Sequence, residues 1–229
     1  MIKYNFFGKE CAVDKTAINT SVIKSYLTNQ GFKTSELVLV NQVHGKDVLV
    51  ITNLSQIPQK LIDADAIVTN LKNISIGILT ADCVPILLFD SVNKIIGAVH
   101  AGWQGAFKKV VENAIDEMLK LGAKIENIKV VIGPCIRQDS YEVDEKFYQN
   151  FLSENQENKK FFSSSKNQNH YLFDLVSYVV KKLENKGIRT VLDDGIDTYP
   201  NEEALFSYRR NTHQNINDEL RNLSVIEIF

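Results

Sequence analysis

Eight short runs rich in β-branched and aliphatic residues constrain the fold of this 229-residue chain more than any other feature. Runs of this length, bounded by polar turns, are typical of β-strands. They are Leu37–Val40, Val48–Thr52, Ala66–Thr69, Ile74–Thr80, Val84–Phe89, Ile95–His100, Lys129–Ile132 and Ser224–Ile228. Many strands beside few helices predict a mixed α/β (α+β) fold built on a large mixed sheet.

Apolar residues recur with helical periodicity in a smaller part of the chain. From Gln104 to Leu119 they fall on one face, and Gly122 then predicts the end of that helix. A second helix is predicted over Phe173–Lys186, and Tyr141–Leu152 is a third candidate. The polar stretch Ser153–Asn169 has no apolar periodicity, so we expect a mobile surface loop there.

Composition and charge exclude several classes of function. Hydrophobic residues make up 44% of the chain, and no linker or internal repeat divides it, so a single domain over residues 1–229 is expected. A net charge of −2 provides no basic field for nucleic acid. The sequence contains neither a membrane-spanning apolar run nor a signal-peptide pattern. We therefore expect a cytoplasmic protein, a monomer or homodimer, that binds a small molecule.

Polar or glycine-rich segments interrupt or end the apolar runs at four places where chemistry is plausible. The segment Asn41–Gly45 contains His44, although a simple hairpin turn would also explain it. The segment Thr80–Cys83 places an acid and a thiol between two strongly apolar runs. Burying an ionised Asp82 costs several kcal/mol unless a partner or a metal compensates. The alternative is an Asp82 that caps backbone amides beside an inert Cys83.

A third interruption, Gly97–Gly105, leads from a strand through a glycine-rich turn into the first predicted helix. His100 lies at the end of the strand. Gly102 would let the backbone approach a ligand, and the helix start would offer N–H groups to an anion such as phosphate. The segment matches neither the dinucleotide-binding nor the P-loop pattern, so it does not by itself predict a nucleotide site.

The cysteines are too few and too scattered for a disulfide framework, which fits a reducing compartment. Together His44, Cys83 and His100 form a Cys-His₂ set, and three protein ligands with one open position are typical of catalytic zinc. Cys135 follows another strand and could line a pocket, although a buried cysteine more often serves as a small hydrophobe.

Five motifs spread along the chain carry a resemblance to a known family. They are Gln42–Gly45, Thr80–Cys83, His100–Gly105, Ile132–Ile136 and Phe206–Arg210. These motifs resemble the YfiH family, also called the laccase-domain or polyphenol oxidase-like family, which is related to the purine nucleoside enzyme FAMIN. The resemblance implies a compact mixed α/β fold with sheets layered between helices, and a zinc site at the three ligands named above.

The resemblance also implies an activity. Members of this family cleave purine nucleosides with phosphate, methylthioadenosine among the candidate substrates, and deaminate adenosine. Several positions depart from the family pattern: Gln104 replaces an Arg, Ser140 replaces a Cys, and Asp197 replaces the Cys of a Cys-Thr pair. The terminal Thr-Gly-Arg is absent, and Arg221 is the nearest equivalent.

Zinc lowers the pKa of bound water from 15.7 to about 7, which would supply the nucleophile for deamination at C6 of the purine. Beside Cys83, Asp82 would move the protons or only orient a ligand. For phosphorolysis, Arg209 and Arg210 would bind phosphate through their planar donors, unless they are a solvated surface pair. Gln42, Gly102 and Cys135 complete the predicted substrate-binding set.

Three different functions would also be compatible with the sequence. A copper-dependent polyphenol oxidase (laccase) could use the same ligands, since His₂Cys is also a blue-copper set. However, the chain has only four histidines, and His170 and His213 lie in polar segments expected to be surface loops. Neither methionine is well placed as an axial ligand. A hydrolase that edits peptidoglycan precursors could use the same zinc site, and a non-catalytic metal-binding module would bind zinc without turning over a substrate.

Overall fold

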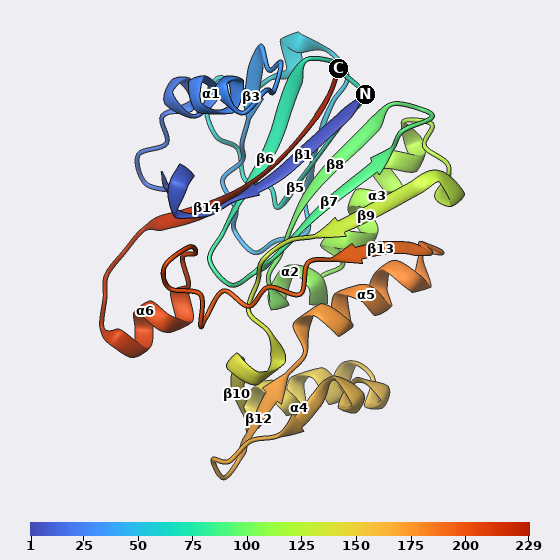
Figure 1. Ribbon diagram of the computed structural model, residues 1–229. Coiled ribbons are helices and arrows are strands. Elements are labelled where there is room, and N and C mark those ends of the chain that lie inside the picture. Colours follow the sequence, from blue (N-terminus) through green and yellow to red (C-terminus); the bar gives the residue numbers. More distant parts are fainter.

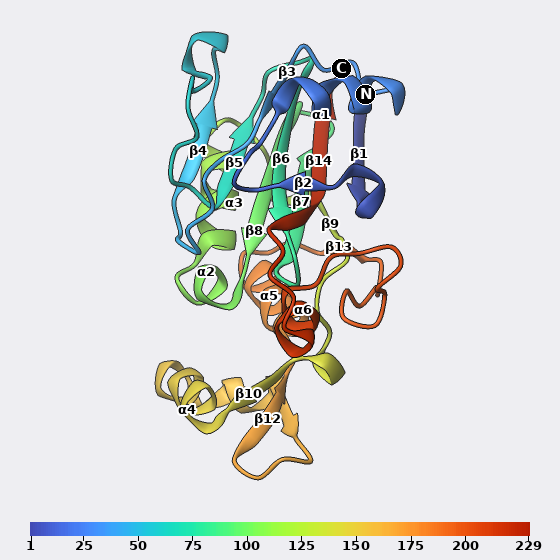
Figure 2. The ribbon, with the colours of Figure 1, turned by 90° about the vertical axis from the view of Figure 1, so that its left-hand side faces the viewer.

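Two β-sheets lie face to face in the computed structural model, which describes residues 1–229 (Figures 1 and 2). The five-stranded sheet has the order β1 (Ile2–Phe7), β14 (Leu220–Ile228), β6 (Ile74–Thr80), β3 (Glu36–Val38), with β2 (Val13–Asp14) also paired to β14. The six-stranded sheet has the order β13 (Thr190–Asp193), β9 (Ile128–Ile132), β7 (Val84–Asp90), β8 (Ile95–Ala101), β5 (Ala66–Thr69), β4 (Val48–Ile51). Both sheets mix parallel and antiparallel pairs.

Alternation along the strands divides the core into layers, because successive side chains of a strand point to opposite faces. In β6, Ile76 and Ile78 pack between the two sheets, whereas Leu79 belongs to the cluster on the outer face. In β8, Ile96 and Ala98 also face the five-stranded sheet. The inner faces of both sheets therefore form one continuous apolar layer.

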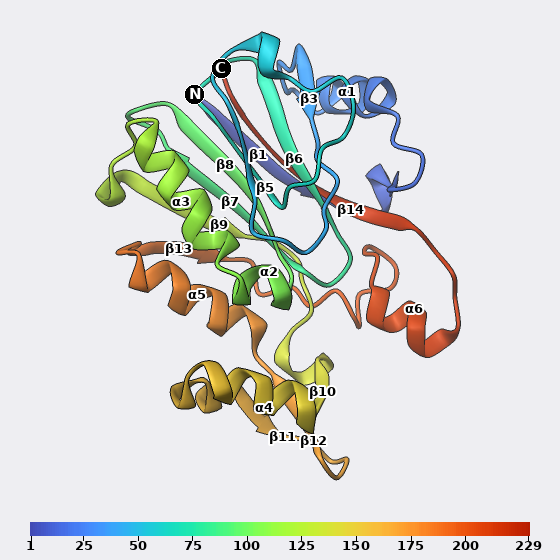
Figure 3. The same cartoon turned by 180° about the vertical axis from the view of Figure 1, so that it is seen from behind.

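Helices cover the two outer faces. Helix α1 (Thr20–Asn29) lies against the five-stranded sheet, and α3 (Val110–Lys120) and α5 (Leu175–Asn185) lie against the six-stranded sheet (Figures 1 and 3). The mixed α/β fold with layered sheets is thus confirmed. No helix is long and apolar enough to cross a membrane.

A smaller unit extends from one end of these layers. It contains α4 (Glu145–Glu154) and an antiparallel sheet of β10 (Glu142–Asp144), β12 (His170–Phe173) and β11 (Phe162–Ser164), drawn at the bottom of Figure 1. Aromatic rings hold it together, with Phe147 and Phe151 stacked 4.9 Å apart. Trp103, on the short helix α2 (Trp103–Phe107), lies 4.9 Å from the ring of Phe147 and so links this unit to the main body.

Each of the eight predicted strands overlaps an observed one, but two predictions about helices and loops were wrong. The helix predicted from Gln104 is divided into α2 and α3, because Lys109 adopts a left-handed φ of 75°. The stretch Ser153–Asn169 is not a loop, since it holds a 3₁₀ helix (Gln156–Phe161) and β11. Its aromatic residues explain the error, because Phe161 is buried against Tyr178.

The two remaining histidines lie in regular secondary structure, which differs from the prediction of surface loops. His170 lies on β12, and His213 lies on α6 (Tyr208–Gln214), rather than in loops. Both residues are exposed, as predicted.

The packing of α5 against the six-stranded sheet generates a first prediction. Leu183 of α5 is fully buried, so Leu183→Ala should lower the free energy of unfolding by about 2–5 kcal/mol through lost burial and a residual cavity. Leu192 of β13 is 55% exposed, and Leu192→Ala should change the free energy of unfolding by about 0.5 kcal/mol or less. Urea titrations of both variants measure the difference, and equal effects would contradict this packing.

Candidate metal centre

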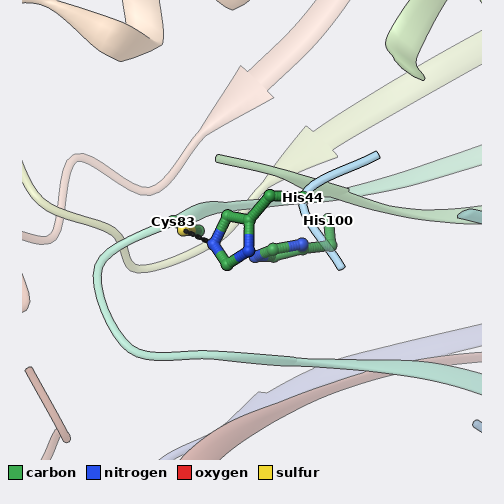
Figure 4. A group of neighbouring side chains, drawn as sticks. All are labelled: His44, Cys83 and His100. Atoms are coloured by element: carbon green, nitrogen blue, oxygen red, sulfur yellow. Dashed lines mark hydrogen bonds between the residues drawn. The ribbon is translucent and has the colours of Figure 1, made fainter. Parts of the chain in front are cut away.

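The predicted ligands His44, Cys83 and His100 converge from three separate elements. His44 lies in the loop between β3 and β4, Cys83 in the tight connection from β6 to β7, and His100 near the end of β8. Their ligand atoms all lie within 4.8 Å of one another (Figure 4). The Cys83 Sγ is 3.7 Å from His44 Nε2. Two imidazoles and a thiolate at this separation fit one transition-metal ion.

Gly102 leaves the space that this cluster needs. A Cβ atom at this position would lie 2.8 Å from the His44 ring and 2.9 Å from the Cys83 sulfur. Any larger residue would therefore displace a ligand. The structure places Gly102 against the candidate ligands themselves, at the start of α2.

Asp65 connects two of the ligands and was not predicted from the sequence. Its carboxylate is fully buried and accepts a hydrogen bond from His100 Nδ1 at 2.8 Å. It also accepts the backbone N–H groups of three successive loop residues, Val43, His44 and Gly45, at 3.2, 3.0 and 2.6 Å. Because Nδ1 is engaged, Nε2 of His100 is the nitrogen left for a metal.

Strand pairing explains this contact. Asp65 precedes β5 directly, and the backbone N–H of His100 donates to the Asp65 carbonyl at 2.8 Å, which continues the antiparallel pairing of β5 with β8. His100 has the same parity in β8 as Ile96 and Ala98, which face the five-stranded sheet. The His100 side chain therefore points to the face of β8 that packs toward the five-stranded sheet.

The charges of the cluster favour a thiolate. Burial alone would raise the pKa of the Cys83 thiol, but the charge of His100 and hydrogen bonds from both histidines outweigh it and lower the pKa to about 6. Burial opposes the charged form of His100, yet Cys83 and Asp65 raise its pKa to about 9. At neutral pH the Cys83 thiol would thus already be ionised, whereas metal binding would displace a proton from His100.

A cavity of about 590 Å³ contains all three ligands in its wall. This is the size of a small-molecule site. Its wall combines apolar, aromatic and basic side chains, among them Ile18, Leu61, Trp103, Tyr141, Lys15, Arg209 and Arg221. Asp82 is the one carboxylate among the lining residues.

The sequence left open whether Asp82 caps backbone groups or moves protons, and the structure gives it the first, structural role. Its Oδ1 accepts a hydrogen bond from Thr198 Oγ1 and its Oδ2 accepts one from the Arg209 backbone N–H, both at 2.6 Å. The residue is buried and adopts a left-handed φ of 89°. Asp82 therefore joins the Cys83 connection to the start of α6.

Two further predicted residues, Gln42 and Arg209, line the cavity. The side-chain amide of Gln42 donates to the Leu79 carbonyl and accepts from the Leu79 N–H, both at 2.7 Å, so it fastens the His44 loop to β6. The Arg209 guanidinium donates to the Glu142 carbonyl at 2.7 Å and lies 5.2 Å from the Tyr141 ring centre.

The structure does not bring Gly102, Arg210 or Cys135 to the cavity wall. The Arg210 guanidinium is buried and donates to the carbonyls of Thr198, Tyr199 and Leu205. Cys135 is fully buried, and burial raises the pKa of its thiol. Arg221 does line the cavity, where it pairs with Glu219 at 3.0 Å.

Comparisons with known proteins agree on one family. Residues 10–226 match a family model described as multi-copper polyphenol oxidoreductase laccase. A purine nucleoside phosphorylase of Rickettsia prowazekii is 40% identical over 197 residues, which cover 86% of this chain and 80% of that protein. An adenosine deaminase from an unknown prokaryotic organism is 36% identical over 53% of this chain and 48% of that protein.

Solved structures show the same fold. The YfiH protein of Bacillus licheniformis superposes with a TM-score of 0.82 at 21% identity, covering 100% of this chain and 93% of that one. The protein NMB0706 of Neisseria meningitidis superposes with a TM-score of 0.77 at 25% identity, covering 93% of this chain and 84% of that one.

The convergence of ligands predicts that the purified protein binds about one metal ion per chain, with zinc as the expected ion. His44→Ala and Cys83→Ala should each lose most of this metal, since each removes one of three ligands. His170→Ala and His213→Ala should retain it, because both side chains are exposed on other elements. Elemental analysis after dialysis measures the content, and full metal in both ligand variants would contradict the assignment.

Removing the Asp65 carboxylate should weaken metal binding without removing a ligand. Asp65→Asn loses one of two acceptor oxygens and turns an amide group toward backbone N–H donors, so metal affinity should fall by about 10-fold to 100-fold. Asp63→Asn is a matched control, since Asp63 is exposed and its side chain pairs only with Asn41. Competition with a chromophoric chelator measures both affinities, and an unchanged Asp65→Asn value would show that this carboxylate serves folding alone.

Proposed function

The chain belongs to this laccase-like family, also known as the YfiH family, and we propose that it is a metal-dependent purine nucleoside enzyme that cleaves nucleosides with phosphate and deaminates adenosine. The observation that carries the proposal is a three-ligand metal cluster in the wall of a cavity that also contains an arginine without an acidic partner. The names of the relatives, which are purine nucleoside phosphorylase and adenosine deaminase, support this choice of substrate.

The donor set favours zinc over copper. Two imidazoles and a thiolate with no fourth protein ligand match a catalytic zinc site. A blue-copper site would add a weak axial methionine, but Met118 of α3 is buried in the core and Met1 is 76% exposed. When bound, zinc would act as a Lewis acid and would make a nucleophile available at neutral pH by lowering the pKa of water.

Deamination requires a group that moves protons beside the reacting carbon. Asp82 is the carboxylate in the cavity wall and directly precedes the ligand Cys83. Thr198 and the backbone of Arg209 hold both of its oxygens in place. We assign the proton transfers to Asp82 on this basis, with orientation of the Cys83 connection as its second role.

Phosphorolysis requires a seat for phosphate. Lys15 and Arg221 both pair with Glu219, at 2.8 and 3.0 Å, which neutralises much of their charge. Arg209 has no carboxylate partner, and its one hydrogen bond to protein from the guanidinium goes to a backbone carbonyl. Its remaining planar donors suit a phosphate. Helix α2 after Gly102 has only five residues, so Arg209 carries this part of the proposal.

The purine itself needs an apolar, flat surface. Trp103 and Tyr141 both line the cavity, and the aromatic cluster of α4 supports their rings from behind. Aromatic side chains of this kind bury large apolar area at a fixed position. The cavity therefore combines a metal centre, an anion seat and an aromatic wall.

Incubating metal-loaded protein with adenosine tests the proposal directly. Chromatography should show adenine and ribose 1-phosphate only when phosphate is present, and inosine with or without it. Cys83→Ala should abolish both reactions. Arg209→Ala should reduce phosphorolysis by about tenfold or more and deamination much less, because only phosphorolysis uses a bound anion. Arg189→Ala, an exposed arginine outside the cavity, is the control.

A different set of products would identify a different function. Release of serine from an amino-acylated muramyl precursor, without any nucleoside product, would establish a peptidoglycan-editing hydrolase. Oxidation of a phenol by copper-loaded protein alone would establish a polyphenol oxidase. Metal binding without any turnover would leave a non-catalytic module.

A further inference from the structure

Tyr141 brings a hydroxyl group to the metal cavity that no protein group uses. The residue lines the cavity, and its hydroxyl is not among the tyrosine hydroxyls that form hydrogen bonds in the structure. The hydroxyls of Tyr171 and Tyr178, by contrast, donate to Glu145 at 2.7 Å and to Glu154 at 3.0 Å, outside the cavity. Tyr141 therefore has an unused polar group where those tyrosines have a structural one.

The position of the Tyr141 ring is fixed by its surroundings. Its backbone N–H donates to the Gln138 carbonyl at 3.1 Å, and its carbonyl accepts the Phe173 N–H at 2.9 Å. The ring packs 5.8 Å from the ring of Phe173 and 6.3 Å from that of Phe147. A ligand that met this hydroxyl would thus not have to order a mobile side chain.

The surroundings also determine which chemistry the hydroxyl offers. Burial raises the pKa of Tyr141, so the phenol stays protonated and can donate a hydrogen bond at neutral pH. Arg209 contacts the face of the ring rather than the hydroxyl, which leaves the O–H group free. A rigid ring with a free donor is a common way to orient a ligand in a cavity.

We propose that the Tyr141 hydroxyl donates a hydrogen bond to an acceptor atom of the bound nucleoside and so helps to select the substrate. This inference rests on the proposed nucleoside function and adds a binding residue to it. A hydroxyl kept for the fold would have a partner in the protein, and its loss would cost stability. A hydroxyl kept for the ligand costs affinity when it is lost and leaves stability unchanged.

The Tyr141→Phe variant separates these two roles, because phenylalanine keeps the ring and its packing. The probe is inosine in phosphate-free buffer with metal-loaded protein, since inosine can then be neither cleaved by phosphate nor deaminated. Calorimetric titration should show an affinity about threefold to tenfold below that of the wild type. The urea midpoint should be unchanged. In turnover assays, the phosphate concentration for half-maximal rate should also be unchanged, since Arg209 still stacks on the ring.

Tyr178→Phe is the matched control with the opposite expectation. It removes a hydroxyl that donates to Glu154, so the urea midpoint should fall while inosine affinity stays at the wild-type value. If the wild type binds inosine and Tyr141→Phe binds it equally well, the proposal for Tyr141 fails and the nucleoside function stands. The proposal also fails if Tyr141→Phe lowers the urea midpoint and leaves the inosine affinity unchanged. If the metal-loaded wild type does not bind inosine, both proposals fail together.

Discussion

The rest of the site depends on one buried carboxylate, that of Asp65. Removing an ionised group from water costs several kcal/mol, and here three backbone N–H groups and one imidazole compensate. The same four hydrogen bonds fix the left-handed turn at His44 and the ring of His100. One electrostatic centre thus sets the positions of two candidate metal ligands that are far apart in the sequence.

The sequence predicted what short-range patterns encode. Short apolar runs identified β6 and β8, and polar interruptions in these runs identified the residues that converge as a cluster. It did not predict the role of Asp65, because an acid ahead of an apolar run has the same appearance whether it faces solvent or a cross-strand histidine. Nor did it predict the regular structure of Ser153–Asn169, because the few aromatic residues of this stretch pack against residues elsewhere in the chain.

Arg209 and Arg210 also show that sequence patterns do not distinguish the environments of adjacent residues. They are chemically identical and adjacent, yet one guanidinium lines the cavity and the other is enclosed by carbonyl groups. Ser207 caps α6 by accepting the Arg210 N–H at 3.2 Å, while Asp82 accepts the Arg209 N–H. Helix α6 is seven residues long, too short for a periodic pattern to distinguish its two faces.

The order of the five-stranded sheet has a consequence for biosynthesis. Strand β14 lies between β1 and β6, and Ile2 pairs with Ile228 across almost the whole length of the chain. During synthesis, strand β1 therefore cannot pair with β14 until residues 220–228 have left the ribosome. Until then, the edges of β1 and β6 that bind β14 remain unpaired. Contacts so distant along the chain form slowly, and open strand edges promote aggregation. Nascent chains stalled before β14 should consequently depend on chaperones far more than released ones.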